Sequence, residues 1–195
     1  MKLHKQGVRR ANKFSYSDPL KLHFGCGTIY KKGWINIDLF SNIADLSLDL
    51  RERLPFPDNS CSVIYSEHVL EHFDYPLEID CLLEECRRVL KPTGLFSAAV
   101  PDTEWPIKAC LNDDDNYFKL AKELWHPSWC RTKMEHINYH FRQKGEHLFA
   151  YDYETLYLRL KEKGFTKIIK RGFNPELDSE ARKIGSLYID CIKPG

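Results

Sequence analysis

Short apolar runs alternate with longer amphipathic segments along most of this chain. The runs predict strands, because they are bounded by turn residues and several show a period of two. Seven places are expected to form strands: residues 20–24, 34–38, a weaker one within 43–50, 62–66, 95–100, 166–171 and 186–192. Strands that alternate with helical segments are typical of parallel βαβ units, so the pattern predicts an α/β fold.

Two segments predict helices most clearly. Over residues 76–90 the apolar side chains recur at helical spacing and predict one buried face, made by Ile79, Leu82, Leu83, Cys86 and Leu90. The residues at 91–94, Lys-Pro-Thr-Gly, predict the end of this helix. Asp152 is a plausible N-cap for a second helix, which Gly164 ends.

The pattern loosens over residues 103–150. This segment holds three of the four tryptophans and half of the eight histidines. We expect an irregular insertion that lies over the ligand-binding edge of a single domain, residues 1–195. Each of these aromatic residues is more often a packing residue, but together they could wall an acceptor pocket: Trp105, Trp125, Trp129, His126, His136 and His140.

Composition limits the alternatives. A chain of 195 residues is long enough for one ordinary domain. Twenty-nine basic and 28 acidic residues give a net charge of +1, which argues against a partner made of bulk nucleic acid. No apolar run approaches the ~20 residues of a membrane span. Seven cysteines without a C-x-x-C pair predict reduced thiols in a cytoplasmic protein.

Residues 1–18 are expected to form a basic N-terminal arm. Its first 13 residues contain five Lys or Arg and no acid. No apolar core follows them, so we do not expect a signal peptide. A solvated arm is the simpler interpretation, and a lid or a phosphate-binding tail is the alternative.

Glycines and carboxylates follow the predicted strands. Ligands of open α/β sheets bind at the carboxyl ends of the strands. A turn of Gly25, Cys26 and Gly27 follows the first strand, and four acids follow the later ones: Asp38, Asp49, Glu67 and Asp102. Alone, each could be a tight turn or a solvated acid. Because crowded carboxylates repel one another, their joint occurrence predicts a cationic or polyhydroxyl ligand.

Two common nucleotide motifs do not fit. A dinucleotide fingerprint needs a third glycine where Tyr30 stands, and Asp38 comes too early for it. A P-loop needs G-K-[ST], which the chain lacks. S-adenosylmethionine (SAM) needs no phosphate cradle. Its ribose diol, adenine and positive sulfonium suit a glycine turn ringed by acids.

An ordered set of motifs supports the same ligand. They are Lys21–Thr28, Gly33–Asp38, Leu54–Ser60, Ile64–His72, Glu85–Gly94, Tyr151–Phe165 and Ser186–Pro194. The set resembles class I SAM-dependent methyltransferases, and more narrowly the small methyltransferase type 11-like proteins often linked to sugar and polysaccharide pathways. The resemblance implies a Rossmann-like sandwich with a mostly parallel seven-stranded sheet and an antiparallel last strand.

The resemblance also implies a cofactor site. Its residues would be Gly25, Cys26 and Gly27 along SAM, Asp38 and Leu39 at the ribose, Asp49 and Leu50 at adenine, and Glu67 and His68 closing the pocket. The chain departs from the family in lacking the third glycine. Only residues 28–33 separate Gly27 from the second strand, so the first helix is expected to be about one turn or absent.

The same region contains an alternative motif. His68, Glu71 and His72 match H-x-x-E-H, the inverzincin zinc-peptidase pattern. Its place after a central strand favours the methyltransferase, with Glu71 a structural acid, His72 a pocket-wall residue and no metal ion. A third hypothesis is a pseudoenzyme that binds SAM without turnover.

The expected reaction transfers a methyl group from SAM to an oxygen or nitrogen nucleophile of a small molecule. A sugar or nucleotide-sugar acceptor follows from the family resemblance alone. If the acceptor must lose a proton, His147 is the first candidate general base and His72 the second.

Overall fold

The computed structural model describes residues 2–11 and 19–195. Among these, six strands form one sheet in the order β2-β1-β3-β4-β6-β5. The first four of that order are parallel, and β6 runs antiparallel to both β4 and β5, which confirms the antiparallel last strand. The bounds are β1 Leu20–Phe24, β2 Ile35–Ile37, β3 Cys61–Glu67, β4 Leu90–Pro101, β5 Thr166–Arg171 and β6 Ser186–Ile192.

The expected strand within residues 43–50 is wrong. In this fully described segment only one isolated parallel bridge forms, between Ile37 and Leu46. The backbone N–H of Asn36 donates to the Asp45 carboxylate at 2.8 Å instead of to a strand carbonyl. The ladder therefore does not continue past one bridge, and the sheet has six strands instead of seven.

The connection between β1 and β2 is as short as expected. Residues 25–34, all of which the structure describes, form turns and contain no helix. The two strands nevertheless pair in parallel, with Leu22 opposite Ile35. The turn that carries the predicted cofactor glycines is therefore held by its two flanking strands and by side-chain bonds to Gly27 from Asp38 and Ser41.

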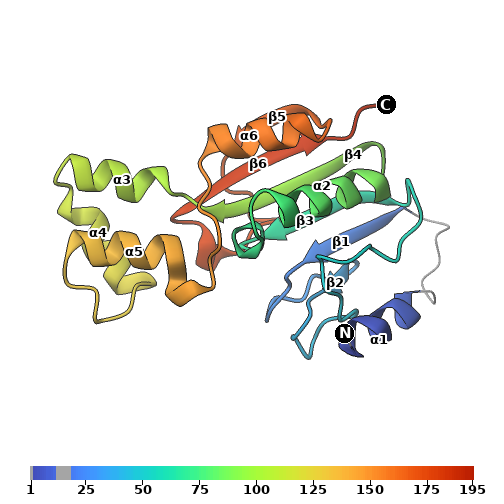
Figure 1. Ribbon diagram of the computed structural model, residues 1–195, viewed down its shortest axis with the longest axis horizontal. Helices are drawn as coiled ribbons and strands as arrows, with labels where there is room; N and C mark the ends of the chain where they lie inside the picture. The colour runs from blue at the N-terminus through green and yellow to red at the C-terminus, as the bar shows by residue number, and fades with distance from the viewer. Residues whose placement is uncertain (1, 12–18) are drawn as a thin grey trace.

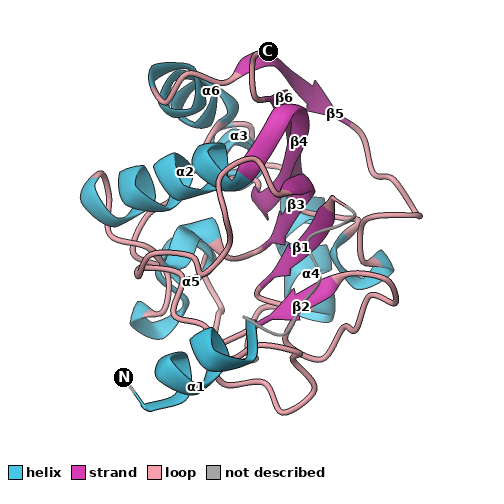
Figure 2. Ribbon diagram, turned by 90° about the vertical axis from the view of Figure 1, so that its right-hand side faces the viewer, coloured by secondary structure: helices cyan, strands magenta, loops and turns pink. Residues whose placement is uncertain are grey.

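Two long helices cover one face of the sheet. Figure 2 shows α2 and α6 on the same side. Their inward side chains, Leu82 and Leu160 among them, join the strands in the main hydrophobic core. Asp152 caps α6 as expected, since its carboxylate accepts from the Thr155 N–H at 2.8 Å. The helices are α1 Lys2–Ala11, α2 Leu77–Val89, α3 Glu104–Leu111, α4 Asp115–Leu124, α5 Lys133–Arg142 and α6 Tyr153–Glu162, with single 3₁₀ turns η1 Leu70–His72, η2 Gln143–Gly145 and η3 Glu180–Arg182.

The loop that leads from β5 to β6 reaches over β3. Tyr65 points to the face opposite its neighbour Ile64, as successive strand residues must. Its hydroxyl donates to the Asp178 carboxylate at 3.0 Å. The next loop residue, Ser179, donates its N–H to Glu67 at 3.0 Å. These bonds fix the loop against the carboxyl half of β3.

Residues 103–150 are not the irregular insertion that the sequence suggested. They contain α3, α4 and α5, which Figure 1 shows as a group beyond the carboxyl ends of the parallel strands. This helical group has a small core of its own, formed by Ala109, Tyr117, Phe118 and Ala121. The buried members of this core are only two alanines and two aromatic residues from α3 and α4, so the segment shows no long apolar stripe.

The basic arm is only partly described, and the described part is not a solvated chain. Residues 2–11 form α1, in which Gly7 and Ala11 are buried. Gly7 lies against Ser47, whose carbonyl oxygen would be 2.3 Å from an added Cβ. Residues 1 and 12–18 of the arm lie outside the described residues. Across the described part of the chain, no helix has the length and apolar character needed to cross a membrane.

Candidate active site

A cavity of about 620 Å³ lies at the carboxyl ends of β1 and β2. Its size is in the range of small-molecule sites, roughly 300–1,000 Å³. It includes six of the nine predicted cofactor residues, namely Gly25, Asp38, Leu39, Asp49, Leu50 and His68. The strands thus bring together residues that the chain separates, and we refer to this space as the cofactor cavity.

Gly25 is a position that only glycine can occupy. Its φ is +60°, in the left-handed region, and an added Cβ would lie 2.2 Å from Val69 Cγ2. Gly27 also has a positive φ, +51°, but its Cβ would meet no described atom within 4 Å. The missing side chain at Gly25 therefore lets the backbone and Val69 meet at the cavity wall.

Asp38 ties the glycine turn to the end of β2. Its Oδ2 accepts from the Gly27 N–H at 3.0 Å. Its Oδ1 accepts from the N–H groups of Phe40 and Ser41, both at 2.9 Å. A carboxylate has about four acceptor positions, so it retains one for a ligand hydroxyl. Asp38 both shapes the turn and presents a charge to the cavity.

Asp49 lies on the cavity wall but already has a partner. Arg51 donates to its carboxylate from Nε at 2.9 Å and from Nη2 at 2.7 Å. This pair holds the pKa of Asp49 below its usual range. The backbone N–H of Asp49 donates to His4 Nδ1 at 3.1 Å, which connects α1 to this wall.

Three predicted cofactor residues do not reach the cofactor cavity. Cys26 and Glu67 are buried, and Gly27 is exposed, with its N–H donated to Asp38. Glu67 is turned toward the loop residue Ser179, and burial raises its pKa. Their places depend on side-chain directions that the sequence motif does not specify.

A second cavity of about 300 Å³ lies between the sheet and the helical group. We refer to it as the acceptor cavity. Of the aromatic residues singled out in the sequence, Trp125, His126 and His140 line it, whereas Trp105, Trp129 and His136 do not. His147 and Arg182 complete this wall. His68 lines both cavities, so the two spaces adjoin at that side chain.

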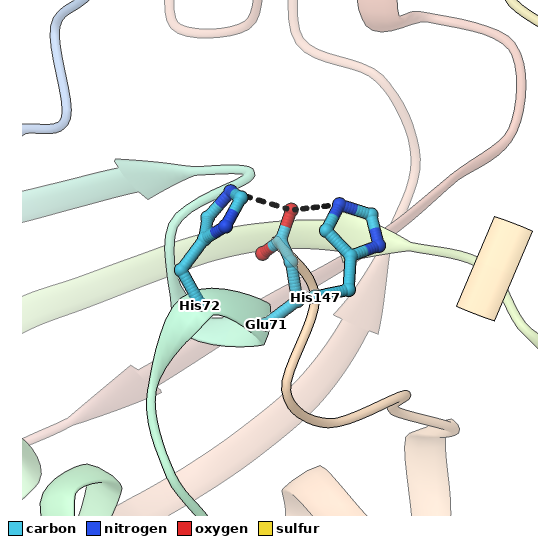
Figure 3. A group of neighbouring side chains, drawn as sticks. All are labelled: Glu71, His72 and His147. Carbon is cyan, nitrogen blue, oxygen red and sulfur yellow. Dashed lines mark ion pairs between the residues drawn. The ribbon is translucent and has the colours of Figure 1, made fainter. Parts of the chain in front are cut away.

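Glu71 lies at the centre of a group of histidines near this junction. Its side chain is only 2% exposed, and its Oε1 faces His68 Nδ1 at 3.7 Å and the Nε2 atoms of His72 and His147 at 4.0 Å each. Figure 3 shows the side chains of His72 and His147 converging on Glu71 from two sides. Burial raises the pKa of Glu71 to about 8. The sequence identified Glu71 but not its central position.

The hydrogen bonds of the two flanking histidines define their tautomers. His72 Nδ1 lies 2.8 Å from the carbonyl oxygen of Glu146, and His147 Nδ1 lies 3.1 Å from that of His140. A carbonyl oxygen only accepts, so each Nδ1 carries a proton and donates it. Each neutral ring then presents an unprotonated Nε2 toward Glu71.

Comparison with known proteins agrees with this arrangement. Residues 40–98 match the protein family described as "Methyltransferase domain". A SAM-dependent methyltransferase from Archaeoglobus fulgidus has a similar structure, with a TM-score of 0.58, 17% identity, and coverage of 98% of this chain and 94% of that one. The family match covers less than half of the chain, and the similarity to the solved structure shows a shared fold. A comparison with curated proteins finds no match.

Two further solved structures share the fold of this chain. One is a SAM-dependent methyltransferase from Methanosarcina mazei, with a TM-score of 0.56, 18% identity, and coverage of 94% of this chain and 96% of that one. Another is Haemonchus contortus phosphoethanolamine N-methyltransferase 2 in complex with SAM, with a TM-score of 0.55 and 14% identity. The comparison covers 98% of this chain and 53% of the nematode enzyme.

The zinc-peptidase alternative lacks its structural context. That motif needs both histidines on one helix. Here η1 contains only Leu70–His72, and His68 lies before it with a φ of +53°. Residues 68–72 also lie inside the segment that matches the methyltransferase family.

Proposed function

We propose that this chain is a SAM-dependent methyltransferase that transfers the methyl group of SAM to an oxygen or nitrogen nucleophile of a small molecule held in the acceptor cavity. The observation that carries the proposal is the junction of the two cavities at His68. A donor in one cavity and an acceptor in the other would meet there. A sugar or nucleotide-sugar is the acceptor class that the family resemblance suggests.

The cofactor cavity has the chemistry that SAM requires. Position 25 must be glycine, because a Cβ there would collide with Val69. Without a side chain, the Gly25 backbone would allow SAM to approach it closely. Asp38 would accept hydrogen bonds from the ribose hydroxyls, while Leu39 and Leu50 offer apolar contacts to the adenosine. In this proposal Cys26 and Glu67 support the cavity wall from behind, and Gly27 holds Asp38 in place through its N–H.

Alignment is the main contribution of the protein to the reaction. SAM supplies a methyl group already activated on a positive sulfonium. The walls of the two cavities hold the nucleophile in line with that methyl group, and such positioning can lower a barrier by several kcal/mol. The bond from acceptor to methyl carbon forms as the carbon–sulfur bond breaks. The acceptor proton passes to the unprotonated Nε2 of His147 or His72.

We also propose a cytoplasmic location and no bulk nucleic-acid partner. All seven cysteines lie within the described residues and are free, as expected for thiols in a reducing compartment. The formal net charge of +1 provides no strong attraction to a phosphate backbone.

A transfer assay tests the proposal. The full chain is incubated with SAM labelled in its methyl group and a panel of sugars, nucleotide-sugars, phenols and amines. We expect labelled product from at least one acceptor, and micromolar binding of SAM by titration calorimetry. Binding of SAM without transfer to any acceptor would instead support the pseudoenzyme hypothesis.

Two variants separate binding from transfer. Asp38→Ala should weaken SAM binding by about tenfold or more, since it removes a charged hydrogen-bond acceptor. His147→Ala should reduce transfer by about 100-fold and leave the SAM dissociation constant within about twofold. Trp129→Ala is the control, because Trp129 lines neither cavity. Equal loss of SAM binding in the His147 variant would contradict its role as a base.

A further inference from the structure

We propose that Glu71, His72 and His147 bind one divalent transition-metal ion at the boundary between the two cavities. Each residue offers one ligand atom, and the three atoms lie within 4.8 Å of one another. Figure 3 shows that they come from two separate segments, the 3₁₀ turn η1 and the loop that follows η2. Two imidazoles and one carboxylate are a common ligand set for catalytic metal ions.

The state of Glu71 points to a missing positive charge. Its side chain is 2% exposed, and neither carboxylate oxygen has a hydrogen-bond partner among the described residues. A buried charge without a partner is strongly unfavourable, so such groups are paired, coordinate a metal ion or become neutral. Both oxygens remain available to a cation.

The three histidines around Glu71 present lone pairs to it instead of protons. The Nδ1 protons of His72 and His147 are donated to backbone carbonyls, which leaves each Nε2 unprotonated. A ligating histidine usually donates its other ring N–H in this way, and the bond fixes the orientation of the ring.

A hydrogen bond also fixes the tautomer of His68. The Ser186 hydroxyl donates to the Arg182 carbonyl at 2.7 Å, so it accepts from His68 Nε2 at 2.8 Å. The unprotonated Nδ1 of His68 then lies 3.7 Å from the Glu71 carboxylate. Three lone pairs and a carboxylate therefore converge without a hydrogen bond between them, and a cation would stabilise this arrangement. His68 is a candidate fourth ligand.

The required movement is small. Ligand atoms about 2.1 Å from one ion lie roughly 3.0–3.4 Å apart. The Nε2 atoms of His72 and His147 are each 4.0 Å from Glu71 Oε1, so each pair must close by less than about 1 Å. The two segments are already joined, since Leu148 and Phe149 donate their N–H groups to the Glu71 carbonyl at 2.8 and 3.2 Å.

The site is placed to act on the acceptor. His72 lines the cofactor cavity and His147 lines the acceptor cavity, so open coordination positions would face the reacting groups. If the proposed function is correct, the ion would bind an acceptor hydroxyl and lower its pKa, which favours an oxygen over a nitrogen acceptor. With the ion bound, the two Nε2 atoms are ligands, and the hydroxyl loses its proton to solvent instead.

A metal titration tests the inference without using activity. The full chain is stripped with EDTA and titrated with Co²⁺, with binding followed by visible absorption and calorimetry. We expect one ion per chain with micromolar or tighter affinity. Loss of a supporting bond to a ligand costs about 10- to 100-fold in affinity, so Glu71→Gln and His147→Ala should each cost at least about 100-fold.

A matched control excludes the other histidine group. His126 and His136 lie 2.7 Å apart, Nδ1 to Nδ1, in the helical group, so His136→Gln should leave Co²⁺ affinity unchanged. Glu71 is buried, so its substitution also affects folding, and the half-exposed His72 provides a second variant. His72→Ala should lose Co²⁺ affinity by the same factor, with little change in melting temperature. An absent Co²⁺ signal, or one lost only in His136→Gln, would overturn the inference.

The outcomes for metal and for SAM are independent. Co²⁺ binding without SAM binding would contradict the proposed function and leave the metal site standing. Undiminished methyl transfer in excess EDTA, by a chain that binds no Co²⁺, would overturn the metal site and leave the methyltransferase standing.

Discussion

The two cavities of this protein are built in different ways. The cofactor cavity is formed mainly by strand ends and the loops between residues 25 and 73, which rest on the main core. The acceptor cavity takes its walls from α4, α5, η3 and the end of β4, and part of it rests on the small core of the helical group. The cofactor cavity therefore forms mainly from segments of the sheet that are near one another in the sequence. The acceptor cavity forms only when segments that are far apart in the sequence pack together.

This difference suggests how donor and acceptor specificity are divided. Most of the cofactor cavity lies on strand ends and short turns such as the one that Asp38 holds, and Glu146, which follows η2, also lines it. The helical group can change its side chains with little effect on that framework. We therefore expect changes in α3–α5 to alter the acceptor and not the donor.

The largest expected effect comes from the small core of the helical group. Phe118→Ala should destabilise α3–α5 by about 3 kcal/mol, because it leaves a cavity among few other buried residues. Hydrogen exchange should show lost protection in α3–α5, with transfer to the acceptor abolished and SAM affinity within about threefold of wild type.

The matched change in the main core is Leu82→Ala. Leu82 is fully buried among the sheet residues. This variant should therefore lower hydrogen-exchange protection across the sheet, and with it both SAM binding and methyl transfer. Equal loss of SAM affinity in the Phe118 variant would show that the two regions are not separable.

The next effect concerns the glycine turn alone. Gly25→Ala should weaken SAM binding by about 100-fold, or about 2.7 kcal/mol, because its Cβ would collide with Val69 in the cavity wall. Gly27 has the same left-handed backbone, but its added Cβ would meet open space. Gly27→Ala should therefore add only about 1 kcal/mol of backbone strain and weaken SAM binding by no more than that. Calorimetric titration measures both, and equal losses would refute the steric explanation.

The smallest effect compares the caps of one helix from each region. Asp152→Ala in α6 and Thr132→Ala in α5 should each cost about 1 kcal/mol, seen as lost protection in α6 and in the helical group respectively. Hydrogen exchange at neutral pH distinguishes the two. Lost hydrogen-exchange protection in the sheet of the Thr132→Ala variant would contradict the separation of the helical group from the sheet.

The Asp152 cap should depend on pH. Hydrogen bonds from the Thr155 side chain and from its backbone N–H lower the pKa of Asp152 in the folded state below its usual range. The stabilisation is therefore fully present above the unfolded pKa and is lost as the pH falls through the folded pKa. The stability difference between wild type and Asp152→Ala, measured by hydrogen exchange in α6, should shrink below about pH 4.

The sequence predicted the parts of the molecule that local rules determine. The glycine turn, the Asp38 position and the short β1–β2 connection follow from neighbouring residues, because strand ends place them directly. The strand expected within 43–50 failed because a side chain, Asp45, took the hydrogen bond of the missing ladder.

The parts that depend on distant contacts could not be predicted. The burial of Glu71 requires the loop at 147–149, whose backbone bonds to Glu71 directly. Nothing near Glu71 in the sequence indicates that loop. The helical group did carry one readable signal, the capping box of Thr132 and Glu135 at the start of α5.

A crystal structure with S-adenosylhomocysteine, the demethylated product of SAM, tests the central claim most directly. We expect the ribose of the ligand to lie at Asp38 and the ligand to contact the backbone of Gly25. Its sulfur should point toward His68, where the two cavities adjoin. Density for the ligand elsewhere on the chain, or none at saturating concentration, would contradict the account.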